Sequence, residues 1–215
     1  MTNTLSTADR SAFDEQGYLV VRGLAPETAR AVMLRETMSD LSAMRGPLEY
    51  EADVGYPGAP CSLDAPGGKT VRRLLRAAVR APVFREWGTS TPIATRINAL
   101  IGHPVVLVEA HHNCIMTKHP AYGTRTGWHR DIRYWRYARE ELVSVWTALV
   151  PERADNGALL VVPGSHRLTL RDDQLDAAQF FREDLPENRA VLARAVTVEL
   201  EPGDVLFFHC RLLHA

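Results

Sequence analysis

The spacing of apolar residues changes near Pro104, and this change limits the folds that the chain can adopt. Before it, helical periodicity with helix start and stop signals predicts helices, together with one short strand at 18–21. After it, short apolar segments alternate with proline, glycine and Asn-Gly signals, which is typical of consecutive strands. The expected helices are 8–16, 25–44, 70–80 and 92–101, and the expected strands are 105–117, 126–134, 142–150, 158–162, 195–200 and 204–209.

Helices followed by a run of short strands predict an α+β fold. We expect the N-terminal helices to pack on one sheet of a β-sandwich or jelly roll. The chain has 215 residues, of which 46% are hydrophobic, so it is long enough for one domain with a substantial core. We therefore predict a single domain over 1–215, with a helix-rich part at 1–103 and a jelly-roll core at 104–215.

Charge, hydropathy and cysteine usage give no sign of a nucleic-acid or membrane partner and bear on the location of the chain. The formal net charge is −1, which gives no electrostatic reason to expect nucleic acid or a membrane surface as a partner. No apolar run approaches the length that spans a bilayer. The three cysteines, Cys61, Cys114 and Cys210, lack metal-type spacing, and their small odd number favours a reducing, cytoplasmic location.

The segment 46–68 contains several Gly-Pro and Pro-Gly breaks and is expected to form a long loop. A loop of this length in a compact domain is often a lid or a substrate-binding segment. A surface excursion without such a role is an equal alternative.

His129-Arg130-Asp131 is the main candidate for a metal-binding motif. Residues i and i+2 of a strand point to the same side, so His129 and Asp131 would project together and Arg130 would point away. With His214 from a distant strand, they would supply two nitrogens and one oxygen, a donor set that suits Fe(II) with positions left open. The tripeptide alone is a weak signal, because an isolated histidine is more often a surface or core residue.

Three ordered motifs make the signal more specific. They are Thr126-Gly-Trp-His-Arg-Asp-Ile-Arg-Tyr-Trp135, Asn156-Gly-Ala-Leu-Leu-Val-Val-Pro-Gly-Ser-His166 and Pro202-Gly-Asp-Val-Leu-Phe-Phe208 followed by Leu213-His214. Together they resemble the phytanoyl-CoA dioxygenase family of Fe(II)/2-oxoglutarate oxygenases over roughly 104–215. The resemblance implies a double-stranded β-helix, a cupin-like jelly roll, in which His129, Asp131 and His214 bind iron and 2-oxoglutarate is the cosubstrate.

Two further residues are candidates for the cosubstrate site. Lys118 follows a β-rich segment, and a lysine at this place in similar proteins points toward 2-oxoglutarate; a solvated strand end is the alternative. Trp146 matches a family tryptophan that lines the same pocket, and a core aromatic is the alternative.

Other polar residues receive structural interpretations. We expect His166 to be a turn histidine that hydrogen-bonds to backbone, and Asp204 to shape the turn before the last strand. His209 is a weaker rival of His214 as a ligand, and only one of the adjacent His111 and His112 can face the interior. Three arginines after the metal motif could hold an anionic substrate, although a solvated basic loop is favoured. These are Arg133, Arg136 and Arg139.

The resemblance implies an Fe(II)- and 2-oxoglutarate-dependent dioxygenase that uses O2 to hydroxylate a C–H bond of a small molecule. Asp131 favours hydroxylation, because a related halogenase would need that ligand position vacant for chloride. A non-catalytic protein, or a metal-binding protein that does not use 2-oxoglutarate, is the alternative on the same scaffold. We also expect the natural protein to continue past Ala215 with further strands and the arginine that binds the remote carboxylate of 2-oxoglutarate in similar proteins. A shortened, inactive relative is the alternative.

Overall fold

The computed structural model describes residues 4–215, in which the chain forms two compact units. The first unit takes in the chain up to Ala25, Thr95–Pro104 and Gly127–Ala215. The second takes in Pro26–Ala94 and Val105–Thr126. The prediction of one domain over 1–215 stays a prediction, and its first three residues lie outside the described part of the chain.

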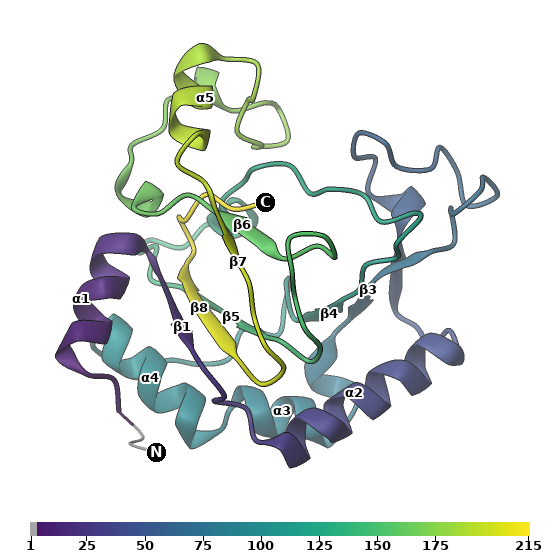
Figure 1. Cartoon of the computed structure of the whole chain (residues 1–215), viewed down its shortest axis with the longest axis horizontal. Coiled ribbons are helices and arrows are strands. Elements are labelled where there is room, and N and C mark those ends of the chain that lie inside the picture. Colours follow the sequence, from purple (N-terminus) through teal and green to yellow (C-terminus); the bar gives the residue numbers. More distant parts are fainter. Residues whose placement is uncertain (1–3) are drawn as a thin grey trace. The chain divides into compact units, whose positions relative to one another are not determined.

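An antiparallel sheet of three strands is the frame of the first unit (Figure 1). Its central strand β8 (Val205–His209) lies between β1 (Tyr18–Val21) and β5 (Val143–Thr147). Val205–Phe208 are buried on both faces of the sheet. The sheet therefore lies in the core of the first unit. Its residues Leu206 and Phe208 pack in one apolar cluster with residues of the next sheet.

A second pair of strands, β6 (Leu159–Val161) and β7 (Val196–Val198), is also antiparallel. The C-terminal segment pairs with β6 through reciprocal backbone hydrogen bonds of 2.9 Å between Leu160 and Ala215. The same segment pairs on its other side with His129, so His214 forms bridges to both Val161 and His129. Three segments distant in sequence are thereby held side by side.

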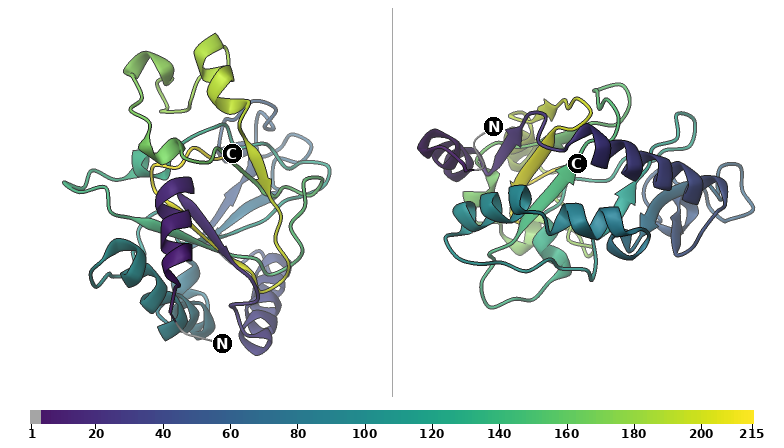
Figure 2. Two further views of the ribbon diagram at one scale, coloured as in Figure 1. Left: turned by 60° about the vertical axis from the view of Figure 1, so that its left-hand side comes forward. Right: turned by 90° about the horizontal axis from the view of Figure 1, so that it is seen from below.

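Helices and 3-10 turns complete the first unit. Helix α1 (Thr7–Gln16) begins at an Ser6 cap that exchanges hydrogen bonds with Asp9, and it ends at Gly17 in the left-handed conformation. Figure 2 shows α1 beside β1, against which it packs. The other elements are α5 (Pro186–Leu192), η3 (Asp131–Tyr134), η4 (Ser165–Arg167) and η5 (Asp172–Gln174). The unit boundary falls within α4 (Thr91–Ile101).

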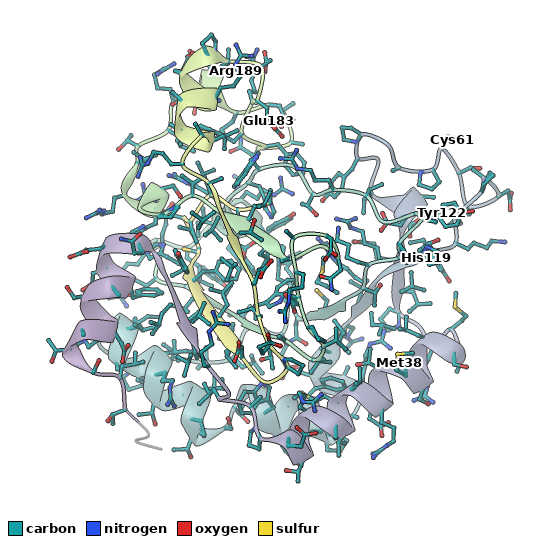
Figure 3. All side chains as sticks on the ribbon, in the orientation of Figure 1. Met38, Cys61, His119, Tyr122, Glu183 and Arg189 are labelled. Atoms are coloured by element: carbon teal, nitrogen blue, oxygen red, sulfur yellow. The ribbon has the colours of Figure 1, made fainter. Side chains whose placement is uncertain are left out.

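The second unit has its own antiparallel sheet of three strands. Its strand order is β2 (Leu48–Tyr50), β3 (Val71–Leu75) and β4 (Cys114–Met116). Helices α2 (Glu27–Ser42) and α3 (Pro82–Gly88) pack on each other, and η1 (Glu51–Asp53) and η2 (Ala77–Val79) are short turns. In the loop after β4, the rings of His119 and Tyr122 stack 5.2 Å apart (Figure 3).

A buried ion pair ties β3 to its neighbours in the second unit. Arg72 and Glu51 are both fully buried, and Arg72 Nη1 lies 3.1 Å from Glu51 Oε2. The same guanidinium donates to the carbonyl and hydroxyl oxygens of Thr124 at 3.1 and 2.8 Å. The helix predicted at 70–80 is wrong: Val71–Leu75 form strand β3, whose alternate buried residues are Arg72 and Leu74, and Ala77–Val79 form the 3-10 turn η2.

Several other predicted elements need correction. The strand expected at 105–117 is confined to β4, and the one expected at 126–134 is reduced to a bridge at His129 followed by η3. The loop expected at 46–68 contains β2 and η1. The seven-residue helices α3 and α5 were not expected, because they are too short to give a clear helical period. Within residues 4–215, no helix is both long enough and apolar enough to cross a membrane.

Candidate metal centre

Two histidines and one carboxylate converge in the first unit. One ligand atom from each of His129, Asp131 and His214 lies within 4.8 Å of the others. Asp131 Oδ1 is 3.7 Å from His129 Nε2 and 3.4 Å from His214 Nε2. All three residues are buried, with 3–5% of their surface exposed. Water can therefore reach this cluster only to a small extent.

The backbone brings the two histidines together. His129 and His214 exchange two hydrogen bonds of 3.0 Å between their peptide groups, and their ring centroids lie 4.2 Å apart. Arg130 is extended, and its Nη2 donates to the carbonyl oxygens of Ser165 and Leu168 at 2.6 and 2.8 Å. The expected alternation of side chains therefore holds locally, although Asp131 is the first residue of a 3-10 turn and not part of a strand.

Hydrogen bonds orient each donor group. The Nδ1 atoms of His129 and His214 lie 2.9 and 3.0 Å from the carbonyl oxygens of Gly127 and Leu212. Each Nδ1 must carry the proton of this bond, which leaves the Nε2 lone pair for another partner. Asp131 Oδ2 accepts a hydrogen bond of 2.6 Å from Ser144 Oγ. The two Nε2 atoms and Oδ1 thus suit a divalent metal ion.

The electrostatics of the cluster also suit a cation. Burial lowers the pKa of His129 well below its usual value, and the charges of His214 and Arg133 act in the same direction. Burial acts to lower the pKa of His214 too, but the charge and hydrogen bond of Asp131 together raise it. One carboxylate is thus shared between two imidazoles, and a metal ion would take the place of the proton between them.

Trp146 lies on β5, on the same face as Ser144, two residues away. Its indole Nε1 donates to both carboxylate oxygens of Glu152 at 2.9 Å. The ring also packs against the cluster that contains Phe208, and Phe208 lies 5.0 Å from the His214 ring. Trp146 is therefore a partly buried aromatic that packs against the core, on a strand that also reaches the candidate metal centre. Its contact with 2-oxoglutarate stays a prediction.

Lys118 belongs to the second unit, where its Nζ donates to the carbonyl oxygen of Thr124 at 2.7 Å. Burial lowers the pKa of this ammonium, and the charge of Arg72 acts in the same direction. Lys118 is thus an exposed residue whose ammonium is held by a backbone carbonyl. Its role toward 2-oxoglutarate stays a prediction.

The structural interpretations of His166 and Asp204 are confirmed. His166 Nε2 lies 3.1 Å from the carbonyl oxygen of Asp14. Asp204 accepts hydrogen bonds of 2.8 Å from the backbone N–H groups of Gly23 and Glu201 and is paired with Arg22.

His209 lies apart from the metal cluster: its ring is 5.3 Å from that of His166, and its Nδ1 accepts from the backbone of Arg211 at 3.0 Å. Burial, followed by the charge of His166, lowers the pKa of His209 to about 4. His111 and His112 belong to the second unit and lie outside the cluster.

Two contributors to the centre were missed in the sequence. Ser144 could have been found, because strand alternation places it on the same face as Trp146. Phe180 gave no signal, since it lies in a loop; its ring makes an edge contact with His129 at 5.8 Å. Arg133 stacks on Phe180, whereas Arg136 and Arg139 are exposed. The expectation of a solvated basic loop therefore holds for the last two arginines only.

Two histidines and one carboxylate on an antiparallel β frame form the donor set of mononuclear non-haem iron proteins. The sequence model of the family described as Phytanoyl-CoA dioxygenase (PhyH) matches residues 13–215. The chain therefore belongs to the phytanoyl-CoA dioxygenase family of Fe(II)/2-oxoglutarate-dependent oxygenases.

Curated relatives agree with this assignment. The chain is 24% identical over 221 residues to a probable phytanoyl-CoA dioxygenase of Caenorhabditis elegans, covering 98% of this chain and 69% of the relative. It is 25% identical over 233 residues to the peroxisomal phytanoyl-CoA dioxygenase of Homo sapiens, covering 99% and 63%. It is also 25% identical over 228 residues to the ectoine dioxygenase of Sphingopyxis alaskensis, covering 98% and 70%. The chain thus spans about two thirds of the length of these relatives.

Solved structures show the same fold. EctD from S. alaskensis with bound Fe superimposes with a TM-score of 0.76 at 23% identity, covering 98% of this chain and 70% of that one. The carbocyclase SnoK of nogalamycin biosynthesis, described as non-haem and alpha-ketoglutarate-dependent, gives a TM-score of 0.74 at 22% identity, covering 100% and 78%. EctD has also been solved with 2-oxoglutarate and 5-hydroxyectoine.

Proposed function

We propose that this chain is an Fe(II)- and 2-oxoglutarate-dependent dioxygenase that hydroxylates a C–H bond of a small molecule. The proposal rests above all on the convergence of His129 Nε2, Asp131 Oδ1 and His214 Nε2, with both Nδ1 atoms already engaged by backbone. We assign these three residues as the iron ligands. Three protein ligands would leave positions for 2-oxoglutarate and O2.

The fold proposed for the metal-binding part is a double-stranded β-helix, with N-terminal helices packed on one sheet and the whole chain acting as one oxygenase domain. The arrangement of β1, β8 and β5, together with β6 and β7, supports this assignment. So does the C-terminal segment, which pairs with His129 on one side and β6 on the other. A rigid β frame positions ligands more precisely than loops do.

When bound, iron and 2-oxoglutarate would supply the oxidising chemistry, in which O2, 2-oxoglutarate and the C–H group of the substrate give succinate, CO2 and the hydroxylated substrate. The residues of the chain have simpler tasks. Neutral His129 and His214 donate nitrogen lone pairs, and Ser144 fixes the Asp131 carboxylate. Burial of the cluster keeps bulk water away from it. Asp131 fills the position that a halogenase would leave to chloride, which favours hydroxylation.

We assign Lys118 and Trp146 to the binding of 2-oxoglutarate. The Lys118 ammonium is a cation that can pair with a carboxylate of the cosubstrate. Trp146 offers an aromatic wall on the strand that carries Ser144. The organic substrate is proposed to be a small molecule. Among the relatives, the printed activities include a dioxygenase and a carbocyclase, so hydroxylation itself is part of the proposal.

The test combines binding and turnover. Anaerobic calorimetry should show Fe(II) binding to the wild type and 2-oxoglutarate binding only after Fe(II). Oxygen uptake and succinate formation should both require 2-oxoglutarate. Asp131→Ala should abolish both activities, while the control Asp155→Ala, at an exposed position of the same unit, should retain them.

Other outcomes would identify a different function. Oxygen uptake without 2-oxoglutarate would indicate an iron enzyme of another kind on the same scaffold. Metal binding with neither 2-oxoglutarate binding nor oxygen uptake would indicate a non-catalytic protein. Full activity of Asp131→Ala with intact iron binding would show that the ligand assignment is wrong.

A further inference from the structure

Arg133 is held in a fixed position two residues after Asp131. Its guanidinium carbon lies 3.9 Å above the centre of the Phe180 ring and 4.6 Å from that of Tyr134. Nη1 donates to the carbonyl oxygen of Ala178 at 3.0 Å, and Nη2 donates to the Tyr134 hydroxyl. A long side chain that is only partly buried, as that of Arg133 is, normally samples several rotamers, so this stacking marks a preorganised cation.

The stacked ring connects Arg133 to the candidate metal centre. The edge of Phe180 contacts the imidazole of His129, with centroids 5.8 Å apart. The loop that carries Phe180 is itself fixed, because Phe181 N donates to the carbonyl oxygen of Trp128 at 2.7 Å. Phe180 therefore lies between a candidate iron ligand and the guanidinium, and it packs against both.

The hydrogen-bonding capacity of Arg133 is only partly used. A guanidinium has five N–H groups, and two of them take part in the bonds to Ala178 and Tyr134. The buried Nε has no acceptor. Among residues 4–215, no carboxylate forms an ion pair with this side chain. By contrast, the neighbouring Arg139 is paired with Glu141 at 3.4 Å.

A preorganised arginine with unused N–H groups and no anionic partner is suited to bind an oxyanion. We propose that Arg133 binds an anionic group of the organic substrate, a carboxylate, phosphate or sulfonate, beside the candidate metal centre. This inference rests on the proposed function and specifies its substrate class. The cation would orient the substrate by a charge-assisted contact, with Phe180 fixing its distance from His129.

The remote carboxylate of 2-oxoglutarate is the competing occupant. Trp146, which is assigned above to 2-oxoglutarate, lies with Ser144 on the sheet that also carries Phe208. The guanidinium of Arg133 lies instead on the Phe180 side of His129. The position of Arg133 therefore favours the organic substrate. The experiment must therefore measure the binding of a simple anion while 2-oxoglutarate is saturating. It must also measure the affinity for 2-oxoglutarate itself.

Paramagnetic relaxation by Mn(II), used in place of Fe(II), provides such a measurement. With 2-oxoglutarate saturating, the methyl protons of methanesulfonate are observed by NMR in the presence of the Mn(II)-loaded protein. Dimethyl sulfone, which has a similar shape but no charge, is the ligand control. The variants are Arg133→Met, which keeps an apolar side chain against Phe180, and Arg136→Met, which changes an exposed arginine of the same loop.

We expect a saturable relaxation enhancement for methanesulfonate in the wild type that inorganic sulfate competes away, and none for dimethyl sulfone. Arg133→Met should weaken methanesulfonate binding about tenfold, the loss that removal of one charge-assisted hydrogen bond commonly causes. Arg136→Met should bind as the wild type does. Arg133→Lys, which keeps the charge without the planar fork, should be intermediate and replaces the methionine variant if that protein does not fold.

Three results would overturn the proposal: no saturable enhancement in the wild type, equal binding by Arg133→Met, or an effect of that variant on 2-oxoglutarate affinity alone. Failure of the wild type to bind Mn(II) would instead reject the proposed function. The anion would then be titrated calorimetrically into the metal-free protein. Binding that is lost in Arg133→Met would still support an oxyanion site, and unchanged or absent binding would overturn it.

Discussion

Ser144 Oγ lies 2.6 Å from Asp131 Oδ2 and donates a hydrogen bond to it. The contact joins β5 to the first turn of η3, thirteen residues earlier in the chain. It occupies one oxygen of the carboxylate and leaves Oδ1 toward the two histidine Nε2 atoms. Ser144 is not a candidate metal ligand, but its hydrogen bond orients Asp131, which is one.

Replacing Ser144 should therefore weaken metal binding without removing a ligand. We expect Ser144→Ala to lower the affinity for Fe(II) by about 10- to 100-fold, the usual effect of losing a hydrogen bond to a metal ligand. Anaerobic calorimetry checks this, with Ser11→Ala on the exposed side of α1 as the control. Equal affinities for the three proteins would show that the hydrogen bond does not orient Asp131.

The protonation of His209 should make the folded state sensitive to acid. Burial, then the charges of His166, Arg211 and Arg130, lower its pKa from 6.5 to about 4. Between these values the unfolded chain binds a proton that the folded chain does not, so stability falls as pH falls. The loss amounts to at most about 3.5 kcal/mol, since one pKa unit corresponds to about 1.4 kcal/mol.

Urea unfolding of His209→Gln at several pH values between 6.5 and 4 measures this contribution. The variant should show a shallower loss of stability than the wild type over this range. His103→Gln is a matched control, because the pKa of His103 is shifted in the opposite direction. The carbonyl of Pro104 and then the Glu141 carboxylate raise the pKa of His103, so its stabilising effect is present at acid pH and is lost as pH rises. Identical pH dependence of His209→Gln and the wild type would contradict the assignment.

The buried pair of Arg72 and Glu51 should contribute strongly to the stability of the second unit. Arg72→Met leaves the Glu51 carboxylate buried without its cation and should lower the free energy of unfolding by about 3–5 kcal/mol. Arg35→Met, which breaks an exposed pair with Glu36, should change it by less than about 1 kcal/mol. Combining Glu51→Gln with Arg72→Met should recover part of the loss. A loss below 1 kcal/mol for Arg72→Met alone would contradict this account.

A side chain at Gly17 should destabilise the fold. Its φ of 80° favours glycine, and a Cβ built there would lie 2.3 Å from His166 Nδ1. Gly17→Ala should lower stability by roughly 2–5 kcal/mol, the sum of left-handed strain and overpacking. Gly23 has a φ of 59° with no atom within 4 Å of such a Cβ, so Gly23→Ala should show the backbone cost alone, about 1–2 kcal/mol. Thermal unfolding compares the two, and equal losses would mean that His166 moves aside freely.

The strands around the candidate metal centre could be predicted largely from the sequence. The strand 18–21 was predicted with its bounds, and β8 begins one residue after the predicted start at Asp204. Their apolar residues and flanking glycines give a clear local signal for a strand. The pairing of His129 with His214 could not be derived in this way, because it depends on a backbone register between segments far apart in the chain.

The errors have a common physical cause. Within the helix predicted at 70–80, residues 71–75 form β3 instead, where Arg72 is buried with Glu51 and Thr124 as its partners. A local pattern of apolar residues does not register these partners. The predicted strand at 126–134 ends early because η3 turns Asp131 toward the two histidines. In both places a polar contact between distant residues overrides local preference.

The central claim is that His129, Asp131 and His214 bind iron. Anomalous scattering at the iron edge, from anaerobic crystals containing Fe(II) and 2-oxoglutarate, tests it most directly. We predict one peak about 2.0–2.2 Å from His129 Nε2, Asp131 Oδ1 and His214 Nε2, with 2-oxoglutarate bound to the same ion. No peak in the crystal, or a peak bound by other residues with this cluster empty, would contradict the account.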